Sequence, residues 1–230
     1  MKQSTLIENI LSKDNLNNAY LQVVRNKGAA GVDGMEYKAL LSHLRKNGEQ
    51  IKESIRNQTY KPMPVKRVEI PKEDGSKRKL GIPTVTDRTI QQAVAQVLTP
   101  IYEEKFHDNS YGFRPQKSAQ QAVLKAVEYM NEECNWIVDI DLEKFFDTVN
   151  HDKLISILNK EIKDGKILSL IRKLLVSGVM VGTQVKETEM GTPQGGNLSP
   201  LLANIMSPRT RRNGPSGKCH VPGRCPHLTR

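Results

Sequence analysis

Residues 137 to 147 read IVDIDLEKFFD, and about fifty residues later the chain continues GTPQGGNLSP, residues 191 to 200. The first stretch is typical of a short apolar strand that ends in carboxylates, and the second of a Gly/Pro-rich turn before a helix. Side chains two apart on a strand share a face, so Asp139 and Asp141 are expected to point the same way. Phosphoryl transfer with two metal ions needs converging carboxylates. Asp141 suits a first metal ligand, although spacing alone equally allows a strand-end cap.

The basic charge of the chain is unevenly placed. The formal net charge is +10, but residues 206 to 230 hold six Lys/Arg and no acid, which leaves 29 basic and 25 acidic residues before them. A net charge of +10 indicates a nucleic-acid partner, whereas +4 over the body only permits one. A solvated basic surface therefore stays open as the alternative.

Other function classes are disfavoured by composition. No apolar run approaches the roughly 20 residues of a membrane span, and the N-terminus MKQSTLIENILSK is too polar for a signal peptide, so we expect a cytoplasmic protein. Three cysteines, an odd number, argue against a disulfide framework. A zinc site in the tail is conceivable, but its spacing matches no common finger: Cys219, His220, Cys225 and His227.

The periodicity predicts a mixed α+β chain. Helices are expected over residues 4–26, 36–46, 48–57, 87–106, 116–132, 150–160 and 166–177 and in LSPLLANI. Expected helix starts are Ser4, Asp87, Pro115 and Asn197. Strands are expected at 65–70 and 77–82 around Asp74-Gly75, in a second hairpin over 179–190, and at 136–140.

The spacing of Asp141, Phe146 and Asp147, followed by VNHDKL, resembles motif A of reverse transcriptases of the group II intron type. The resemblance implies that Asp141 is the catalytic metal ligand and that Leu142 offers its backbone carbonyl to the same ion. It also places Phe146 against C2′ of the nucleotide, where it would exclude ribonucleotides; a core phenylalanine is the alternative.

GTPQGGNLSPLLANI resembles motif B of the same family, whose small residues allow close approach to a base pair. The resemblance puts Gln194 against the incoming nucleotide and template. IPKEDGSKRKLGIPTVTDRTIQQAV resembles the family's fingers hairpin, which implies that Lys72 and Arg78 bind the triphosphate. A solvated charged hairpin is the alternative. Candidate contacts to the RNA backbone are Lys61, Lys66, Arg67 and Arg88.

The resemblance covers about residues 15 to 205, including GAAGVDGM and YGFRP, and implies the fingers and the first part of the palm of a right-hand polymerase. The expected organisation is an N-terminal helical extension at 1–58, fingers at 59–132, a partial palm at 133–205 and a disordered basic tail at 206–230. PTVTDRTIQQAV and YGFRP favour the intron type over the retron type of reverse transcriptase.

The chain contains no Tyr-x-Asp-Asp and no adjacent aspartates, which the family carries in motif C. The implied parent activity is RNA-directed DNA polymerisation with Mg²⁺ and dNTPs on an RNA template and DNA primer. We expect a truncated chain, inactive alone, with an out-of-frame tail and an uncovered, aggregation-prone edge at strand 136–140. Two alternatives stay open: a non-catalytic, maturase-like module that binds intron RNA and assists splicing, or a degenerate product without function.

Overall fold

The computed structural model describes residues 6–71, 75, 77–132, 139, 141–142, 145–192 and 195–207. The chain forms two compact units. The first comprises Met1–Lys105 and Leu142–Ser207, and the second Phe106–Asp141 and Pro208–Arg230. Helices and a small sheet occur together, which confirms the predicted α+β class.

The N-terminal helix is broken once. Instead of one helix over 4–26, the structure has α1, Leu6–Leu11, and α2, Lys13–Arg25. Ser12 lies between them with an extended backbone, and its side chain accepts a hydrogen bond from the amide of Asn15 at 3.4 Å. The prediction was wrong here because serine caps a new helix in preference to continuing the old one. The predicted cap Ser4 lies outside the described residues.

Helix α3, Leu40–Arg56, is continuous where two helices were predicted, and a short 3-10 turn, Tyr37–Ala39, precedes it. It runs through Asn47 and Gly48 without a break. A glycine inside a helix costs about 1 kcal/mol relative to alanine. The apolar stripe that continues on both sides, with Leu40 and Ile55 buried, outweighs that local cost.

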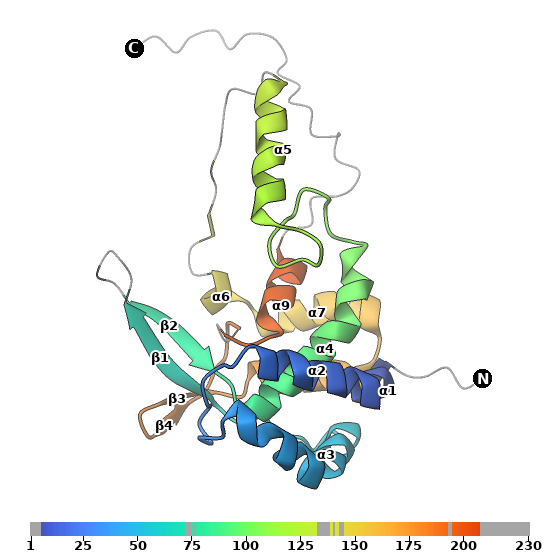
Figure 1. Ribbon diagram of the computed structural model, residues 1–230, viewed down its shortest axis with the longest axis vertical. Helices are drawn as coiled ribbons and strands as arrows, with labels where there is room; N and C mark the ends of the chain where they lie inside the picture. The colour runs from blue at the N-terminus through green and yellow to red at the C-terminus, as the bar shows by residue number, and fades with distance from the viewer. Residues whose placement is uncertain are drawn as a thin grey trace, which may run out of the picture. The chain divides into compact units, whose positions relative to one another are not determined.

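The first unit contains a four-stranded sheet of order β2-β1-β3-β4. Strands β1, Val65–Pro71, and β2, Lys77–Ile82, form the predicted antiparallel hairpin, and Gly75 has the positive φ of +77° that its turn requires. The second predicted hairpin is β3, Val179–Val181, with β4, Gln184–Lys186. The sequence did not predict that β1 and β3 pair in parallel and so join both hairpins (Figure 1).

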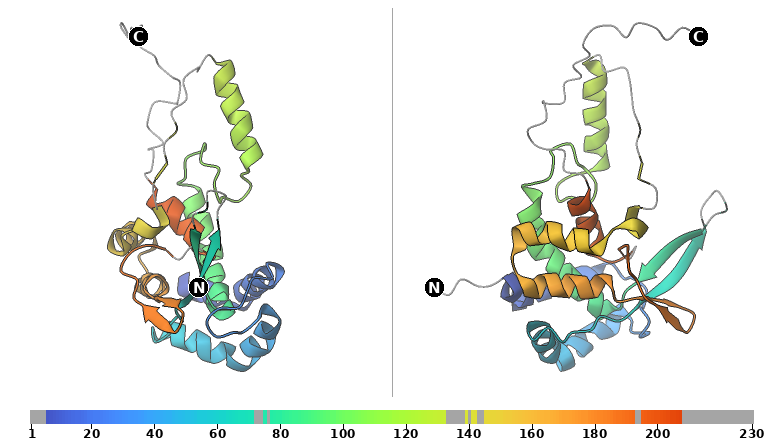
Figure 2. Two further views of the ribbon diagram at one scale, coloured as in Figure 1. Left: turned by 90° about the vertical axis from the view of Figure 1, so that its left-hand side faces the viewer. Right: turned by 180° about the vertical axis from the view of Figure 1, so that it is seen from behind.

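Helix α4, Val85–Glu103, is the central helix of the first unit, and α1, α2 and α9 pack against it (Figures 1 and 2). Its N-cap is Thr84, not the predicted Asp87. The Thr84 hydroxyl accepts from the Asp87 amide at 3.1 Å, so Asp87 is already in the first turn.

The carboxylate of Asp87 is buried and connects α4 to the segment before β1. It accepts hydrogen bonds from the Tyr60 hydroxyl at 2.7 Å, the Met63 amide at 3.2 Å and the Thr84 hydroxyl at 2.7 Å. Burial raises the pKa of Asp87 above the ordinary carboxyl value, although these bonds oppose the shift. Burial, with the Asp87 charge, likewise raises the pKa of Tyr60.

The remaining helices of the first unit are α6, Phe145–Thr148, α7, His151–Ile162, α8, Gly165–Leu175, and α9, Ser199–Met206. Helices α7 and α8 agree with the predicted 150–160 and 166–177 and lie side by side (Figure 2). The predicted cap of α9 was wrong: its N-cap is Leu198, without a side-chain bond. Asn197 instead donates its side-chain amide to Gln92 Oε1 of α4 at 3.0 Å.

The second unit contains α5, Ala119–Asn131. It begins after Ser118, in a capping box with Gln121, and not after Pro115 as predicted, because the reciprocal Ser–Gln bonds define the stronger start. Arg114 is buried in the segment before this helix, donates to the carbonyls of His107 and Ser110, and lies 5.4 Å from the centre of the Phe106 ring.

Two sequence predictions fall largely beyond the described part of the chain. Residues 136–138 and 140 of the predicted strand and 208–230 of the tail lie outside the described residues; Asp139 has no regular secondary structure. Among the helices that the structure describes, none is long and apolar enough to cross a membrane. The predicted domain boundaries stay predictions.

Candidate functional site

Backbone hydrogen bonds join the end of the motif A segment to the start of the motif B segment. The Thr192 amide donates to the Phe146 carbonyl at 2.7 Å, and the Gly191 amide to the Val149 carbonyl at 2.8 Å. Asn150 and Met190 form an isolated antiparallel bridge beside them. We call this set of contacts the A–B junction. These contacts fix the backbone of Phe146 relative to Gly191 and Thr192, which precede Pro193.

Glycine is required at the centre of the A–B junction. Gly191 has φ +90°, and a Cβ there would lie 2.9 Å from the Phe146 carbonyl oxygen and 3.0 Å from that of Asp147. Side chains rarely adopt this φ, and real Cβ atoms do not approach so closely. The two segments can therefore lie this close only without a side chain at 191.

His151 binds the A–B junction through its side chain and was not predicted from the sequence. The side chain is buried, at 4% exposure, in the first turn of α7, and its Nε2 lies 2.6 Å from the Gly191 carbonyl oxygen. We assign the donor role to Nε2 because the carbonyl can only accept. The Val-Asn-His sequence gave no local signal for this contact, which spans 40 residues.

The second half of the motif B loop lies against the fingers hairpin and α4. A Cβ on Gly195, which has φ +117°, would be 2.6 Å from the Gly81 carbonyl oxygen of β2. A Cβ on Gly196 would be 2.6 Å from Gln91 Oε1 of α4. Pro193 and Gln194 lie outside the described residues, but the residues on both sides of them are held by close packing. The motif B loop thus connects the motif A segment to the hairpin.

The strand register assigns the hairpin cations to two faces. Arg67 pairs with Gly81, and Lys79 with Glu69, so Arg67 and Lys79 share one face. Lys66 and Arg78 fall on the other face. Lys61, Lys66 and Arg78 are exposed, Arg67 is half-buried, and Lys72 lies outside the described residues.

The face with Arg67 and Lys79 borders a cavity of about 80 Å³ at the A–B junction. Asp147 and Thr192 line the same cavity. The Thr192 hydroxyl is buried and has no hydrogen-bond partner among the described residues. Ligand pockets usually exceed about 300 Å³, so this cavity is too small for a nucleotide. We call this cavity the polar seam, because cations of the hairpin and Asp147 border it together; Lys79 was not predicted there.

Arg88 has a structural role. It is only 8% exposed, and its Nη2 donates to the Ala29 carbonyl at 2.5 Å. A Cβ on Gly28 would lie 2.2 Å from its Nη1, so the GAAGVDGM loop lies directly against the guanidinium. Burial lowers the pKa of Arg88. This burial argues against contact with RNA, and that predicted role of Arg88 gains no support.

The metal-binding residues expected from motif A lie at the surface. Asp139, Asp141 and Leu142 are exposed, and the Leu142 carbonyl accepts a hydrogen bond from the Phe145 amide at 3.3 Å. Within the described ranges, no group of three or more His, Cys, Asp or Glu side chains could hold a metal ion. The described donors therefore have suitable chemistry but are too few for a complete site.

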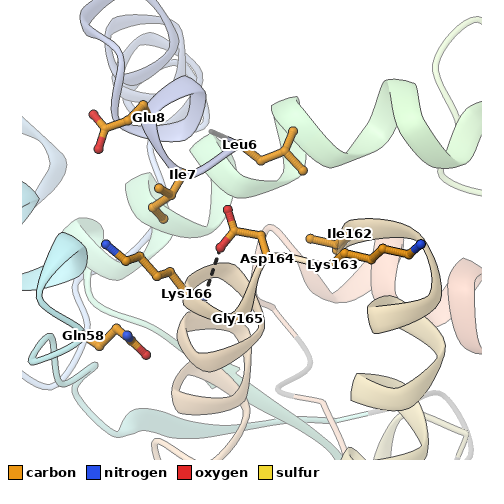
Figure 3. A pocket seen from close by; sticks show the side chains of 9 residues that line it. All are labelled: Leu6, Ile7, Glu8, Gln58, Ile162, Lys163, Asp164, Gly165 and Lys166. Atoms are coloured by element: carbon orange, nitrogen blue, oxygen red, sulfur yellow. Dashed lines mark hydrogen bonds between the residues drawn. The ribbon is translucent and has the colours of Figure 1, made fainter. Parts of the chain in front are cut away.

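A surface hollow of about 620 Å³ lies away from these motifs in sequence, between α1 and the turn that joins α7 to α8 (Figure 3). Asp164 accepts from the Lys166 amide at 3.0 Å and so caps α8. Glu8 binds Arg56 at 3.0 Å, which lowers the pKa of Glu8. Both carboxylates of the hollow thus have structural partners, and we assign it no chemistry.

The fold is that of a reverse-transcriptase fingers and palm fragment. A solved structure titled "Partial Cas6-RT-Cas1--Cas2 complex" matches 88% of this chain, and 34% of the matched chain, with a TM-score of 0.60 and 24% identity. Residues 70–212 match the family described as reverse transcriptase (RNA-dependent DNA polymerase). The chain belongs to this family.

The sequence relatives place the chain with the group II intron-encoded members. It is 43% identical over 188 residues to the group II intron-encoded protein LtrA of Lactococcus lactis subsp. cremoris, covering 81% of this chain and 31% of LtrA. It is 36% identical over 188 residues to protein YkfC of Escherichia coli K12, covering 79% of this chain and 49% of YkfC. A third relative is the putative COX1/OXI3 intron 2 protein of Saccharomyces cerevisiae, 38% identical over 166 residues, with 72% of this chain and 19% of that protein covered. The chain thus spans about a third of LtrA and half of YkfC.

Proposed function

We propose that this chain carries the nucleotide- and template-binding part of an RNA-directed DNA polymerase of the group II intron type. Its partners would be an RNA template, a DNA primer and a dNTP. The A–B junction carries the proposal, because Thr192 binds the backbone of Phe146 while Gly195 lies against the hairpin strand β2. The three segments that resemble the family's nucleotide-binding motifs therefore meet in the first unit.

Within that proposal, Phe146 contacts the sugar, Gln194 the base pair, and Lys72 and Arg78 the triphosphate. Arg78 would act from the hairpin face opposite the polar seam, because the register places it across from Ile70. Charge-assisted hydrogen bonds from such cations suit a phosphate chain.

The Asp141 carboxylate and the Leu142 carbonyl would hold Mg²⁺, which prefers oxygen ligands. Such an ion, when bound, stabilises charge on the attacking and leaving oxygens. The 230 residues hold no adjacent aspartates to complete a two-metal site. We therefore propose that the chain binds substrates but does not polymerise by itself.

Primer extension tests this proposal. The purified chain is incubated with an RNA template, a labelled DNA primer, dNTPs and Mg²⁺, and Asp141→Ala serves as the matched control. We expect no extension above background from either protein. Extension by the unsubstituted chain that Asp141→Ala abolishes would show that these residues suffice for catalysis and would refute the proposed inactivity.

A second candidate function is intron RNA binding without catalysis, in the manner of a maturase. Lys61 and Lys66 favour it, because both are exposed at the start of the hairpin. One relative is named nuclear intron maturase 2, mitochondrial, of Arabidopsis thaliana, 34% identical over 121 residues. A degenerate product without function would bind neither the polymerase substrates nor intron RNA.

The RNA-binding candidate is tested by the salt dependence of affinity for a structured RNA. Lys61→Glu with Lys66→Glu should weaken binding and flatten the salt slope by about 0.7–0.9 for each phosphate that is no longer neutralised. Lys153→Glu with Lys160→Glu, on exposed positions of α7, is the control with the same charge change. A variant without residues 206–230 separates the contribution of the basic tail. Equal slopes for both double variants would remove the hairpin from RNA binding.

A further inference from the structure

A groove of about 530 Å³ lies in the first unit, with walls from α2 and α3 and a floor that includes Ile90 of α4. The α3 wall extends over about four turns, roughly 20 Å. The residues that α3 contributes at spacings of three and four are Leu41, Leu44, Gly48, Ile51 and Ile55. This spacing is typical of a helix face that packs along a second helix. Leu41 is still 40% exposed, so this face is incompletely covered within the described residues.

A column of cations follows the same helix. Arg45 and Lys52 of α3 are seven residues apart, a spacing that returns an α-helix to nearly the same side, and Lys38 lies seven residues earlier in the 3-10 turn before α3. Arg45 and Lys52 line the groove, and Lys38 and Arg45 line the hollow next to it. Lys52 binds Glu49, the acidic residue among those lining the groove. The edge is therefore predominantly positive and suits an acidic partner.

Gly48, at the middle of the apolar face, supports close approach of another helix. A Cβ at this position would meet nothing within 4 Å. Glycine is unfavourable inside a helix, and the described chain gives no steric reason for it here. A partner helix packed against α3 would give such a reason, because a residue without a side chain allows two backbones to approach closely.

We propose that this groove binds an amphipathic helix of a protein partner. The helix would carry apolar residues at three–four spacing and acidic residues along the edge that faces Arg45 and Lys52. The apolar α3 wall favours a peptide over RNA, because phosphates gain nothing from burying Leu41 or Ile51. This interaction goes beyond nucleotide and template binding and does not depend on either.

Peptide binding to the full chain tests the proposal. The probe is a fluorescent synthetic helix of about three heptads, with Leu and Ile at three–four spacing and Glu at every seventh position. The matched control peptide has Lys in place of Glu. Fluorescence anisotropy should show saturable binding of the acidic peptide and at least about tenfold weaker binding of the basic one.

Two substitutions separate binding from folding. Gly48→Leu should fill the groove and weaken binding of the acidic peptide by at least about tenfold, while the melting temperature stays equal or rises, because leucine favours the helix and a Cβ at this position meets no atom within 4 Å. Arg45→Glu with Lys52→Glu should reverse the preference between the two peptides. Lys153→Glu with Lys160→Glu is the control for charge on another helix.

Three results would overturn the proposal. The first is equal affinity of Gly48→Leu and the unsubstituted chain for the acidic peptide. The second is no peptide binding, together with RNA binding that only the Arg45 and Lys52 reversal weakens, which would assign the cations to RNA. The third is no peptide binding, together with a concentration-dependent dimer that Gly48→Leu dissociates, which would assign the groove to a second copy of the chain.

Discussion

Gly191→Ala should disrupt the A–B junction, because it adds a methyl group where the motif A and motif B segments meet. The residue has φ +90°, and the new Cβ would lie 2.9 Å from the Phe146 carbonyl oxygen, 3.0 Å from the Asp147 oxygen and 3.1 Å from the Asp147 Cα. Backbone strain at such a φ costs about 1–3 kcal/mol. All three neighbouring atoms belong to the backbone, so relief requires the two segments to separate and hydrogen bonds to weaken, at about 1 kcal/mol each.

We therefore expect the free energy of unfolding to fall by about 2–5 kcal/mol, a large part of the usual 5–15 kcal/mol. For a chain of this size the melting temperature would fall by about 5–15 °C. Circular dichroism on heating measures this fall, and hydrogen exchange at 191–192 and 145–150 locates it.

Two further alanine substitutions separate strain from steric overlap. Gly34 has a similar φ, +67°, but a Cβ there would meet nothing within 4 Å, so Gly34→Ala adds backbone strain without steric overlap. Gly48→Ala has neither problem and should raise stability by about 0.5–1 kcal/mol. If Gly191→Ala destabilises the chain no more than Gly34→Ala, the close approach between the motif A and motif B segments is wrong.

Three other substitutions test individual interactions. His151→Ala should cost about 1–3 kcal/mol by removing the donor to the Gly191 carbonyl, seen as faster exchange at 191–192; unchanged exchange there would contradict this hydrogen bond. Asp87→Asn should change how stability depends on pH. Because the pKa of Asp87 is raised in the folded state, protonation of this carboxyl favours folding. Urea unfolding should therefore show that the unsubstituted chain gains stability relative to the variant as pH falls from 7 towards 4. The opposite slope would mean that the buried hydrogen bonds dominate. Arg88→Ala should lower the melting temperature and leave RNA affinity unchanged, since the buried guanidinium binds Ala29; weaker RNA binding by a folded variant would restore its predicted role.

Local signals predicted the local structure well. The hairpin of β1 and β2 follows from Asp74-Gly75 between two β-rich runs, and the structure has it in that place. The break predicted at Gly48 was wrong because the glycine signal is local, whereas the stabilising apolar face spans all of α3. The cap predicted for Asn197 was wrong because its partner, Gln92, is 105 residues distant in sequence.

The candidate site could be predicted only as separate motifs. Resemblance identified Phe146, Gln194 and the hairpin, but not the hydrogen bond from Thr192 to Phe146 that joins two of the segments. His151 and Lys79 were missed for the same reason. Their significance comes from the tertiary fold, which places one against Gly191 and the other at the polar seam.

Hydrogen exchange with substrates bound tests the central claim most directly, namely that the hairpin and the motif A and B segments form one site. An RNA template–DNA primer duplex, a dNTP and Mg²⁺ are added to the chain, and exchange is followed at residues 77–82, 145–150 and 195–199. We predict slower exchange in all three segments together, and loss of this protection in a Lys72→Glu, Arg78→Glu variant but not in Lys153→Glu, Lys160→Glu. Protection confined to residues 206–230, or unchanged exchange in the three segments despite duplex binding, would contradict the account.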